Sequence, residues 1–164
     1  MSRSLRDDIC LYFAYGFNLC TAQMAERCPS GQIFARALLP DYALVFPRRS
    51  ERRNCGVAGI VPCPGRVVWG AVYRLTVEDI ARLDRSEGHI PGRDPAANAY
   101  NKRDIAVLRD GARDDIIRAF TYIAVTMPGR HIPSAEYRGI MLRGARENGL
   151  PSDYLAALEA MEII

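Results

Sequence analysis

The chain has 164 residues, of which 49% are hydrophobic and 25% are charged, which suits one compact domain over residues 1–164 and is short for two. No apolar run reaches the length of a membrane-spanning helix, and the first eight residues, Met1–Asp8, lack the apolar core of a secretory signal. The 22 basic and 19 acidic side chains give a formal charge of +3, too small to indicate a nucleic-acid partner. We therefore expect a cytoplasmic enzyme or binding domain that contacts neither membranes nor nucleic acids.

The cysteine and histidine content argues against metal and disulfide chemistry. The five cysteines form no CxxC pair, and His89 and His131 lie in no cluster with metal-ligand spacing. Without a GxSxG motif, two histidines also leave few ways to build a serine or cysteine nucleophile with its base. The sequence thus predicts free thiols and no metal site.

Arginine takes the place of lysine almost throughout the chain, and Lys102 is the only lysine. A codon bias is the simplest interpretation. The alternative is that some arginines bind an acidic ligand, because a guanidinium group donates two parallel hydrogen bonds to a carboxylate.

The first third of the chain reads as a strand, a short helix and further strands. The apolar, aromatic run from Ile9 to Tyr15 predicts a buried strand, which Gly16-Phe17-Asn18 ends. Thr21 predicts the N-cap of a short helix that extends to about Cys28. Four further strands, separated by turn signals, are predicted over residues 33–39, 42–46, 56–61 and 67–75.

A basic segment, Pro47–Asn54, interrupts these strands. It contains Arg48, Arg49, Arg52 and Arg53. The preferred interpretation is a solvated, mobile connection, and the alternative is a set of side chains that bind a ligand.

The second half of the chain contains two strands and three helices. Thr76 and Asp79 have the spacing of a capping box and predict a helix that ends near Gly88. A loop, two strands joined at Asp110-Gly111, a helix capped by Ser134 and a last helix follow over residues 89–99, 100–108, 116–125, 134–147 and 151–161. The short turns favour antiparallel pairing, and regular βαβ alternation is missing. We therefore expect an α+β fold, with a curved or barrel-like sheet that carries helices on its outside.

The turn after the first strand is one candidate for chemistry. Where a strand ends at Gly16 and turns towards a helix, successive backbone N–H groups can point at one anion or carbonyl oxygen. The side-chain amide of Asn18 can fasten such a turn. On composition alone, a plain turn with Gly16 at positive φ is the better interpretation.

Glu87 is a second candidate because it follows the C-terminal end of a predicted helix. A carboxylate there meets the negative end of the helix dipole, which raises its pKa towards the range of a proton-transferring group. The commoner case is a solvated surface glutamate, and Asp84 competes for any acidic role.

The eight tyrosines of the chain, and two cysteines that lie near the first turn, complete the candidates. We expect most of the tyrosines to be half-buried packing residues, and spacing alone does not select those that bind a ligand. Cys20 and Cys28 have no evident partner base, so buried thiols are a better interpretation than nucleophiles.

Four segments, in order along the chain, resemble the γ-glutamylcyclotransferase family (the AIG2-like superfamily). Tyr12–Leu19, YFAYGFNL, is similar to the family signature YFAYGSNL. The other similar segments are VWGAVY at 68–73, LDRSEG at 83–88 and GARENGLP at 144–151, so the resemblance spans nearly the whole chain. It implies a small mixed β-barrel with peripheral helices and a cavity.

The resemblance also implies which residues form the site. It makes Glu87 the catalytic acid/base. It surrounds a small-molecule γ-glutamyl substrate with Tyr12, Phe13, Ala14, Tyr15, Gly16, Phe17, Asn18, Tyr100, Tyr122 and Tyr137. Phe17 stands where the family motif has serine, and this larger side chain without a hydroxyl leaves the identity of the substrate open.

The reaction implied by the resemblance is intramolecular. The α-amine of a γ-glutamyl compound attacks its own γ-carbonyl, which forms 5-oxoproline and releases an amino acid or another amine. Glu87 would carry the proton, and the substrate supplies its own nucleophile, so no cofactor is needed. The alternative, motivated by Phe17, is a non-catalytic ligand-binding or regulatory module on the same fold. No motif indicates an oligomeric state, and a homodimer stays open.

Overall fold

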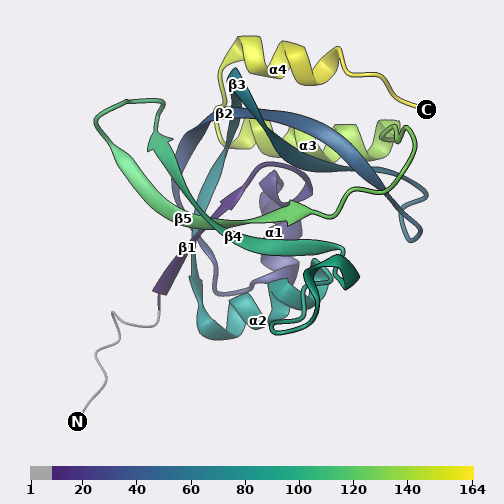
Figure 1. The fold of residues 1–164 in the computed structure, drawn as a ribbon. Coiled ribbons are helices and arrows are strands. Elements are labelled where there is room, and N and C mark those ends of the chain that lie inside the picture. The colour runs from purple at the N-terminus through teal and green to yellow at the C-terminus, as the bar shows by residue number, and fades with distance from the viewer. Residues whose placement is uncertain (1–8) are drawn as a thin grey trace.

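The computed structural model describes residues 9–164, so the expectation for Met1–Asp8 lies outside the described residues. Five strands close into a barrel in the order β1-β3-β2-β4-β5 (Figure 1). The strands are β1 Ile9–Ala14, β2 Gln32–Ser50, β3 Cys55–Thr76, β4 Tyr100–Arg109 and β5 Ile116–Ala124. The helices are α1 Thr21–Arg27, α2 Val77–Ser86, α3 Ala135–Glu147 and α4 Ser152–Glu159, with 3₁₀ turns at η1 Phe17–Leu19 and η2 Pro95–Ala97.

Antiparallel pairing dominates the barrel. β1 pairs with β3 along its whole length and meets β5 in one parallel pair, in which Tyr12 lies beside Phe120. The pairs β2–β3, β2–β4 and β4–β5 are all antiparallel. The predicted α+β fold, with a mostly antiparallel barrel and helices around it, is therefore confirmed.

Two long strands replace four of the short strands that the turn signals predicted. β2 runs through Pro40 and Asp41, and β3 runs through residues 62–65. The two irregular segments face each other, because Pro40 pairs with Val67 and the Asp41 carboxylate accepts a hydrogen bond of 2.9 Å from the Gly65 N–H. The turn signals at Pro40-Asp41 and at residues 62–65 thus mark a bulge, at which β2 and β3 bend together. The prediction of separate strands was wrong because a local turn signal does not show that the partner strand bends at the same level.

The β2–β3 hairpin ends at the arginine-rich segment. Strand pairing continues through Arg48, Arg49 and Ser50, the last of which lies opposite Cys55. The turn itself occupies only residues 51–54, where Asn54 has a φ of 55°, a left-handed conformation that asparagine tolerates. The prediction of a loop over the whole of 47–54 was therefore wrong for its first half, because the ladder with β3 carries the extended conformation almost to the tip.

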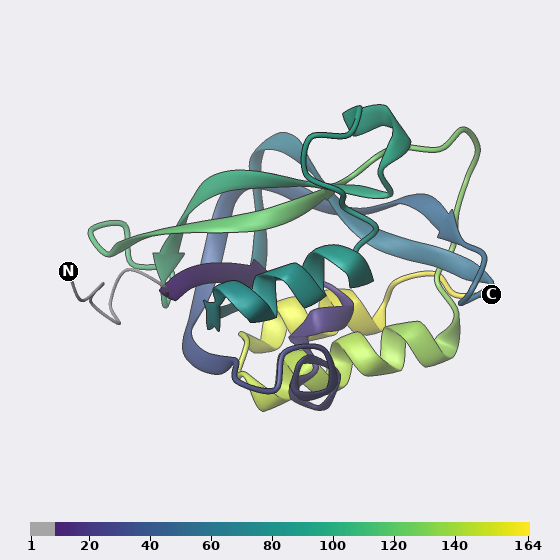
Figure 2. The ribbon, with the colours of Figure 1, turned by 90° about the horizontal axis from the view of Figure 1, so that it is seen from below.

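The helices position the segment that follows β1. In Figure 2 the β4–β5 hairpin lies on one side of the barrel, and α1, α3 and α4 lie on the opposite side. Helix α3 packs directly on η1, since a Cβ added at Gly144 would lie 2.3 Å from the carbonyl carbon of Leu19. The barrel interior is filled by apolar side chains such as Phe13, Val68 and Val107, which are fully buried. The turn after β1 is thus held between this core and α3.

Helix caps agree with the sequence at two of three positions. Thr76 and Asp79 form the predicted capping box, and the Ser134 hydroxyl accepts the Tyr137 N–H at the start of α3. The N-cap of α1 is Cys20 and not Thr21. Thr21 instead donates its hydroxyl to Oε2 of Glu147 at 2.7 Å, because α3 brings a carboxylate to that point.

Three further features bear on the classes of function considered above. No helix within residues 9–164 is long and apolar enough to cross a membrane. The same residues contain no group of three or more His, Cys, Asp or Glu side chains placed to hold a metal ion. The five cysteines are free thiols, and burial raises the pKa of Cys28 to about 11.

Candidate active site

One cavity of about 450 Å³ opens at the junction of the barrel and the helices, a size typical of sites for small molecules. Eight residues expected around a substrate line it together with the expected acid/base, from five separate parts of the chain: Tyr12, Tyr15, Gly16, Phe17, Asn18, Glu87, Tyr100, Tyr122 and Tyr137. The other two, Phe13 and Ala14, do not border the cavity. Both are fully buried in the core of the barrel.

Glu87 lies in this cavity because it directly follows the last residue of α2. It is the C-cap residue of that helix, where its N–H bonds the carbonyl of Leu83 at 2.9 Å. Gly88, at a φ of 65°, then turns the chain away in a left-handed conformation that favours glycine. The Glu87 side chain is 14% exposed, so the carboxylate faces the cavity and not bulk water.

The environment of the Glu87 carboxyl raises its pKa. Burial is the largest cause, because removing a carboxylate from water disfavours its charged form. The charge of Arg27, the hydrogen bond from Asn18 and the charge of Arg53 act in the opposite direction. The sequence predicted the direction of this shift but attributed it to the helix dipole, whereas burial is its main cause.

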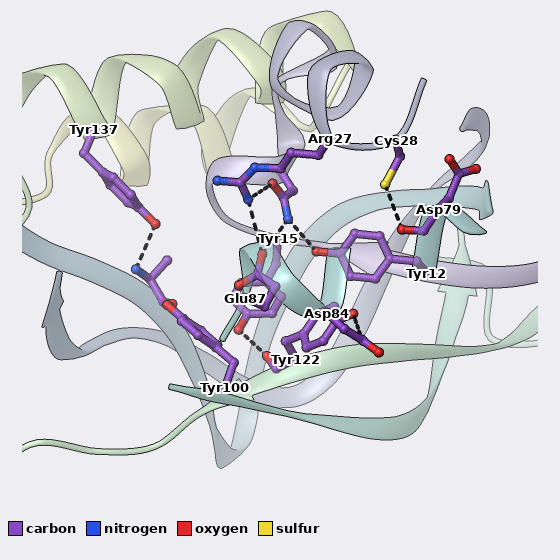
Figure 3. Close-up of polar contacts among 12 residues, drawn as sticks. Tyr12, Tyr15, Arg27, Cys28, Asp79, Asp84, Glu87, Tyr100, Tyr122 and Tyr137 are labelled. Carbon is purple, nitrogen blue, oxygen red and sulfur yellow. Dashed lines mark hydrogen bonds and ion pairs between the residues drawn. The ribbon is translucent and has the colours of Figure 1, made fainter. Parts of the chain in front are cut away.

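A hydrogen-bonded network holds one oxygen of Glu87. The Asn18 Nδ2 atom donates to Oε1 of Glu87 at 2.8 Å and to the Tyr12 hydroxyl at 3.0 Å. Nη1 of Arg27 donates to Oδ1 of Asn18 at 2.7 Å and lies 3.4 Å from the same Oε1 atom. Figure 3 shows Arg27, Tyr12 and Glu87 converging on this point. Among residues 9–164, no hydrogen bond involves Oε2 of Glu87, which leaves that oxygen available to a ligand.

Asn18 therefore has a different task from the predicted one. Its side chain links three residues of the site and makes no bond to the turn itself. Gly16 also differs from expectation, with φ −120° and ψ −123°, so it does not occupy the left-handed region. A Cβ at Gly16 would lie 3.0 Å from Cβ of Ala58. Close packing against β3 is therefore what favours glycine here.

The turn after β1 contains backbone donors without partners and borders the cavity. Within residues 9–164 we find no hydrogen-bond acceptor for the N–H groups of Gly16, Phe17 and Asn18. The first N–H groups of a helical turn have no intrahelical partner. The predicted array of backbone donors is thus consistent with this geometry, since all three residues line the cavity.

Four tyrosines frame the cavity with hydroxyls that are already bonded within the chain. Tyr15 donates to the carbonyl of Tyr122 at 2.6 Å, and Tyr100 donates to the carbonyl of Ala58 at 2.7 Å (Figure 3). The Tyr137 hydroxyl accepts the Ala58 N–H at 3.0 Å. The fourth is Tyr122. Burial raises the pKa of all four phenols, that of Tyr137 to about 12. The four side chains therefore stay neutral and form rigid parts of the cavity wall.

Asp84, the competitor for an acidic role, is occupied elsewhere. Its carboxylate accepts the hydroxyl of Tyr122 at 2.5 Å and pairs with Lys102 at 3.0 Å. Asp84 does not line the cavity. Glu87 is thus the acidic side chain that the fold brings to the turn after β1.

The basic segment also lines the cavity. Arg48, Arg49, Arg52 and Arg53 all border it. Arg48 donates to two backbone carbonyls, those of Ala99 at 3.1 Å and Val125 at 2.8 Å. The preferred interpretation as a solvated connection holds for the exposed tip residues Glu51, Arg52 and Asn54 but not for Arg48, Arg49 and Arg53, which are partly buried at the cavity.

Comparison with known proteins bears on what this constellation does. A family model described as the AIG2-like family matches residues 67–158. A protein named gamma-glutamylcyclotransferase from Mus musculus is 35% identical over 156 residues, which cover 93% of this chain and 78% of the relative. The chain belongs to the AIG2-like γ-glutamylcyclotransferase family. The protein of the same name from Homo sapiens is 33% identical over the same shares of both chains.

A solved structure supports the assignment of this chain to the γ-glutamylcyclotransferase family. A structure entitled gamma-glutamyl cyclotransferase aligns with a TM-score of 0.85 at 31% identity, covering 96% of this chain and 90% of the other. The barrel, the surrounding helices and their connections are thus those of a γ-glutamylcyclotransferase.

Phe17 is where this γ-glutamylcyclotransferase-family chain departs from the signature. Its ring stacks on Tyr137, with centroids 5.5 Å apart and planes inclined by 26°. The guanidinium carbon of Arg53 lies 3.5 Å from the centroid of the Phe17 ring, within the range of a cation–π contact. The phenyl ring thus forms part of the cavity wall and supports a positive charge.

Sequence reasoning missed Arg27 as a residue that lines this cavity. Arg27 lies in the last turn of α1, three residues after the buried Met24, and that spacing puts both side chains on one face of the helix. This spacing was the available signal. It was too weak to use because the carboxylate and the amide that Arg27 contacts come from other parts of the chain.

Proposed function

We propose that the chain is a cofactor-independent γ-glutamylcyclotransferase. It converts a γ-glutamyl-amino acid or a γ-glutamylamine to 5-oxoproline and a free amine. The observation that carries this proposal is the buried carboxylate of Glu87, which shares one cavity with the free N–H groups of the turn after β1. We further propose that residues 1–164 form one domain and that it works in the cytoplasm.

The chemistry needs one group that first accepts and then donates a proton. The α-ammonium of the substrate gives a proton to Glu87, and the resulting amine attacks the γ-carbonyl carbon to form a C–N bond. The tetrahedral intermediate then breaks the bond between that carbon and the leaving nitrogen, which takes the proton back from Glu87. The ring nitrogen gives its second proton to the Glu87 carboxylate, which passes it to the released amine and is thereby regenerated. A carboxyl whose pKa is raised by burial suits both steps, because its charged form is destabilised and it takes up a proton more readily than an ordinary glutamate does.

The two oxygens of Glu87 support a division of labour. Asn18 and Arg27 hold Oε1, which fixes the carboxylate plane. The unbonded Oε2 is the atom that exchanges the proton. Positioning of this kind matters because a reacting group displaced by about 1 Å can lose about a hundredfold in rate.

The turn after β1 supplies the second requirement. Negative charge develops on the γ-carbonyl oxygen during attack, and the N–H groups of Gly16, Phe17 and Asn18 are donors without an acceptor in the described chain. One such donor stabilises a transition state by about 2.7–4 kcal/mol. The same groups could instead hold the substrate α-carboxylate. No added nucleophile enters the scheme, because the substrate carries its own.

The test is the substitution Glu87→Gln. The amide keeps the shape and the Oε1 acceptor but cannot take up a proton. We expect release of 5-oxoproline from γ-glutamyl-amino acids to fall by about 10²–10⁴-fold, while the circular dichroism spectrum and ligand binding persist. Glu78→Gln is the matched control, since Glu78 is an exposed residue of the same helix α2 and lies outside the cavity lining. Full activity of the Glu87→Gln protein would defeat the proposal.

A second candidate function rests on Phe17. The ring occupies part of the wall where the family signature has serine, which suits a non-catalytic ligand-binding or regulatory module on the same fold. Purified protein that binds γ-glutamyl compounds but yields no 5-oxoproline would favour this function.

A further inference from the structure

A cluster of arginines that the proposed chemistry does not use borders the cavity. We define the arginine rim as Arg48, Arg49, Arg52 and Arg53, all from the tip of the β2–β3 hairpin, and all four line the same cavity as Glu87. We propose that the arginine rim selects γ-glutamyl substrates whose leaving amino acid carries a second, side-chain carboxylate. This inference rests on the proposed function and adds the class of substrate.

The charge balance of the cavity is the first argument. Six arginines and two glutamates line it, the rim together with Arg27, Arg85, Glu51 and Glu87. Within residues 9–164, the only ion pair among these eight is that of Arg27 with Glu87. The cavity is therefore strongly positive without a ligand, a state that favours anionic ligands and speeds their approach.

The state of Arg53 is the second argument. Its guanidinium carbon lies 3.5 Å from the centroid of the Phe17 ring, and the residue is half-buried. No hydrogen bond from its side chain is found in residues 9–164. Burial, with the nearby charge of Arg27, lowers the pKa of Arg53, as expected for a cation without its counter-ion. A partly desolvated, unpaired guanidinium is costly, and a carboxylate that accepts two parallel N–H groups removes that cost.

The position of Arg53 is the third argument. Arg53 and Arg27, the ion-pair partner of Glu87, both lie against the Phe17 ring, at 3.5 and 5.3 Å from its centroid, so Arg53 lies near the reacting end of the cavity. The Arg53 guanidinium packs against Phe17, and none of its N–H groups donates a hydrogen bond within residues 9–164, so they are free to bind a ligand. Phe17, which departs from the family signature, is thus the platform on which Arg53 of the rim packs.

The charge of the substrate is the last argument. The γ-glutamyl part brings one α-carboxylate and one α-ammonium, which together carry no net charge. A neutral leaving amino acid adds one carboxylate. A leaving glutamate or aspartate adds two, which match the unpaired positive charge of the rim better.

The experiment compares γ-glutamylglutamate with γ-glutamylglutamine, which differ only by one carboxylate in place of an amide. We measure kcat/KM for 5-oxoproline release by the wild-type protein, and binding of both dipeptides to the Glu87→Gln protein by calorimetry. We expect a preference of about tenfold or more for the acidic dipeptide in both measurements. The preference should shrink as salt rises from low to high concentration, because the interaction is ionic.

Substitutions assign the preference to the rim. Arg53→Gln and Arg52→Gln should each bring the ratio of the two kcat/KM values towards one. Arg103→Gln, an exposed strand residue outside the cavity, should keep the ratio. Equal kcat/KM values for both dipeptides, or a preference that survives both rim substitutions, would overturn the inference while the cyclotransferase function stands.

The two hypotheses fail in different ways. If neither dipeptide yields 5-oxoproline but the acidic one binds more tightly, the rim selects its ligand and the proposed catalysis is wrong. If neither dipeptide binds, the inference is wrong as well.

Discussion

Nδ2 of Asn18 lies 2.8 Å from Oε1 of Glu87, although the two residues are 69 positions apart in the sequence. Asn18 itself is held by Arg27, which donates to its Oδ1 atom at 2.7 Å. This second bond fixes the orientation of the amide, so that the NH₂ group and not the oxygen faces the carboxylate. The turn after β1 and the end of α2 are thus joined through one side-chain amide.

Asn18→Ala tests this link. The variant loses a buried donor to a carboxylate, which costs about 1–3 kcal/mol and corresponds to a fall in kcat/KM of about 5- to 150-fold. The hydrogen bond from Asn18 lowers the pKa of Glu87, so its loss should move the acidic limb of the kcat/KM profile to higher pH. A profile that keeps its acidic limb while only the stability falls would assign Asn18 a structural role alone.

Arg27→Gln separates the charge of Arg27 from its hydrogen bonds. The positive charge of Arg27 lowers the pKa of Glu87, so the acidic limb should again move to higher pH. Arg27→Lys retains the charge and should keep the limb near its original position while kcat falls. Arg146→Gln, which removes an exposed ion pair with Glu159, is the control and should change neither. The prediction is wrong if the glutamine and lysine variants have the same profile.

The raised pKa of Glu87 also makes stability depend on pH. The folded chain binds this proton more tightly than the unfolded chain, so the contribution of Glu87 to stability is fully present below the ordinary glutamate pKa and is lost as pH rises through the raised value. Relative to wild type, the Glu87→Gln protein should therefore gain stability as pH rises from about 4 towards neutrality. Urea unfolding of both proteins across this range measures the difference. A difference that is constant with pH would contradict the shift.

Two glycines in α3 give opposite predictions for the same substitution. A Cβ at Gly144 would lie 2.3 Å from the backbone of Leu19, whereas a Cβ at Gly139 meets nothing within 4 Å. Gly144→Ala should therefore destabilise the fold by about 1–3 kcal/mol or more and lower activity, because it pushes α3 away from the turn after β1. Gly139→Ala should stabilise by about 0.5–1 kcal/mol, since alanine is the better helix former. Thermal unfolding and the activity of both variants test the pair.

Phe17→Ser restores the residue of the family signature and removes the platform under Arg53. We expect a loss of stability of up to about 3 kcal/mol, because a packed ring at the cavity wall is truncated. The kcat/KM for γ-glutamylglutamate should fall relative to that for γ-glutamylglutamine. Phe17→Tyr keeps the ring and should retain the wild-type ratio. An increased preference for the acidic dipeptide in Phe17→Ser would contradict the role of the ring as a platform.

Local signals predicted the elements whose limits are set within a few residues. The capping box of Thr76 and Asp79 and the cap at Ser134 were confirmed, because both partners lie within one helical turn. The strands that start at Ile9 and Tyr100 were also confirmed, since apolar runs bounded by turn signals define them. The turn signals at Pro40 and at 62–65 do not end the strands. The two segments lie opposite each other in the β2–β3 ladder, and pairing continues on both sides of them.

The chemical groups of this protein were readable in its sequence, but their environments were not. Residue order alone determined the family, the α+β barrel and the candidacy of Glu87 and the turn after Tyr15, because these rest on local patterns and on segments that match a known signature. Only the tertiary structure decided that Arg27 and Asn18 grip Glu87, that the arginine hairpin covers the cavity and that burial raises the pKa of Glu87. Burial, charge pairing and hydrogen bonding between distant segments depend on distances in space, which closure of the barrel sets.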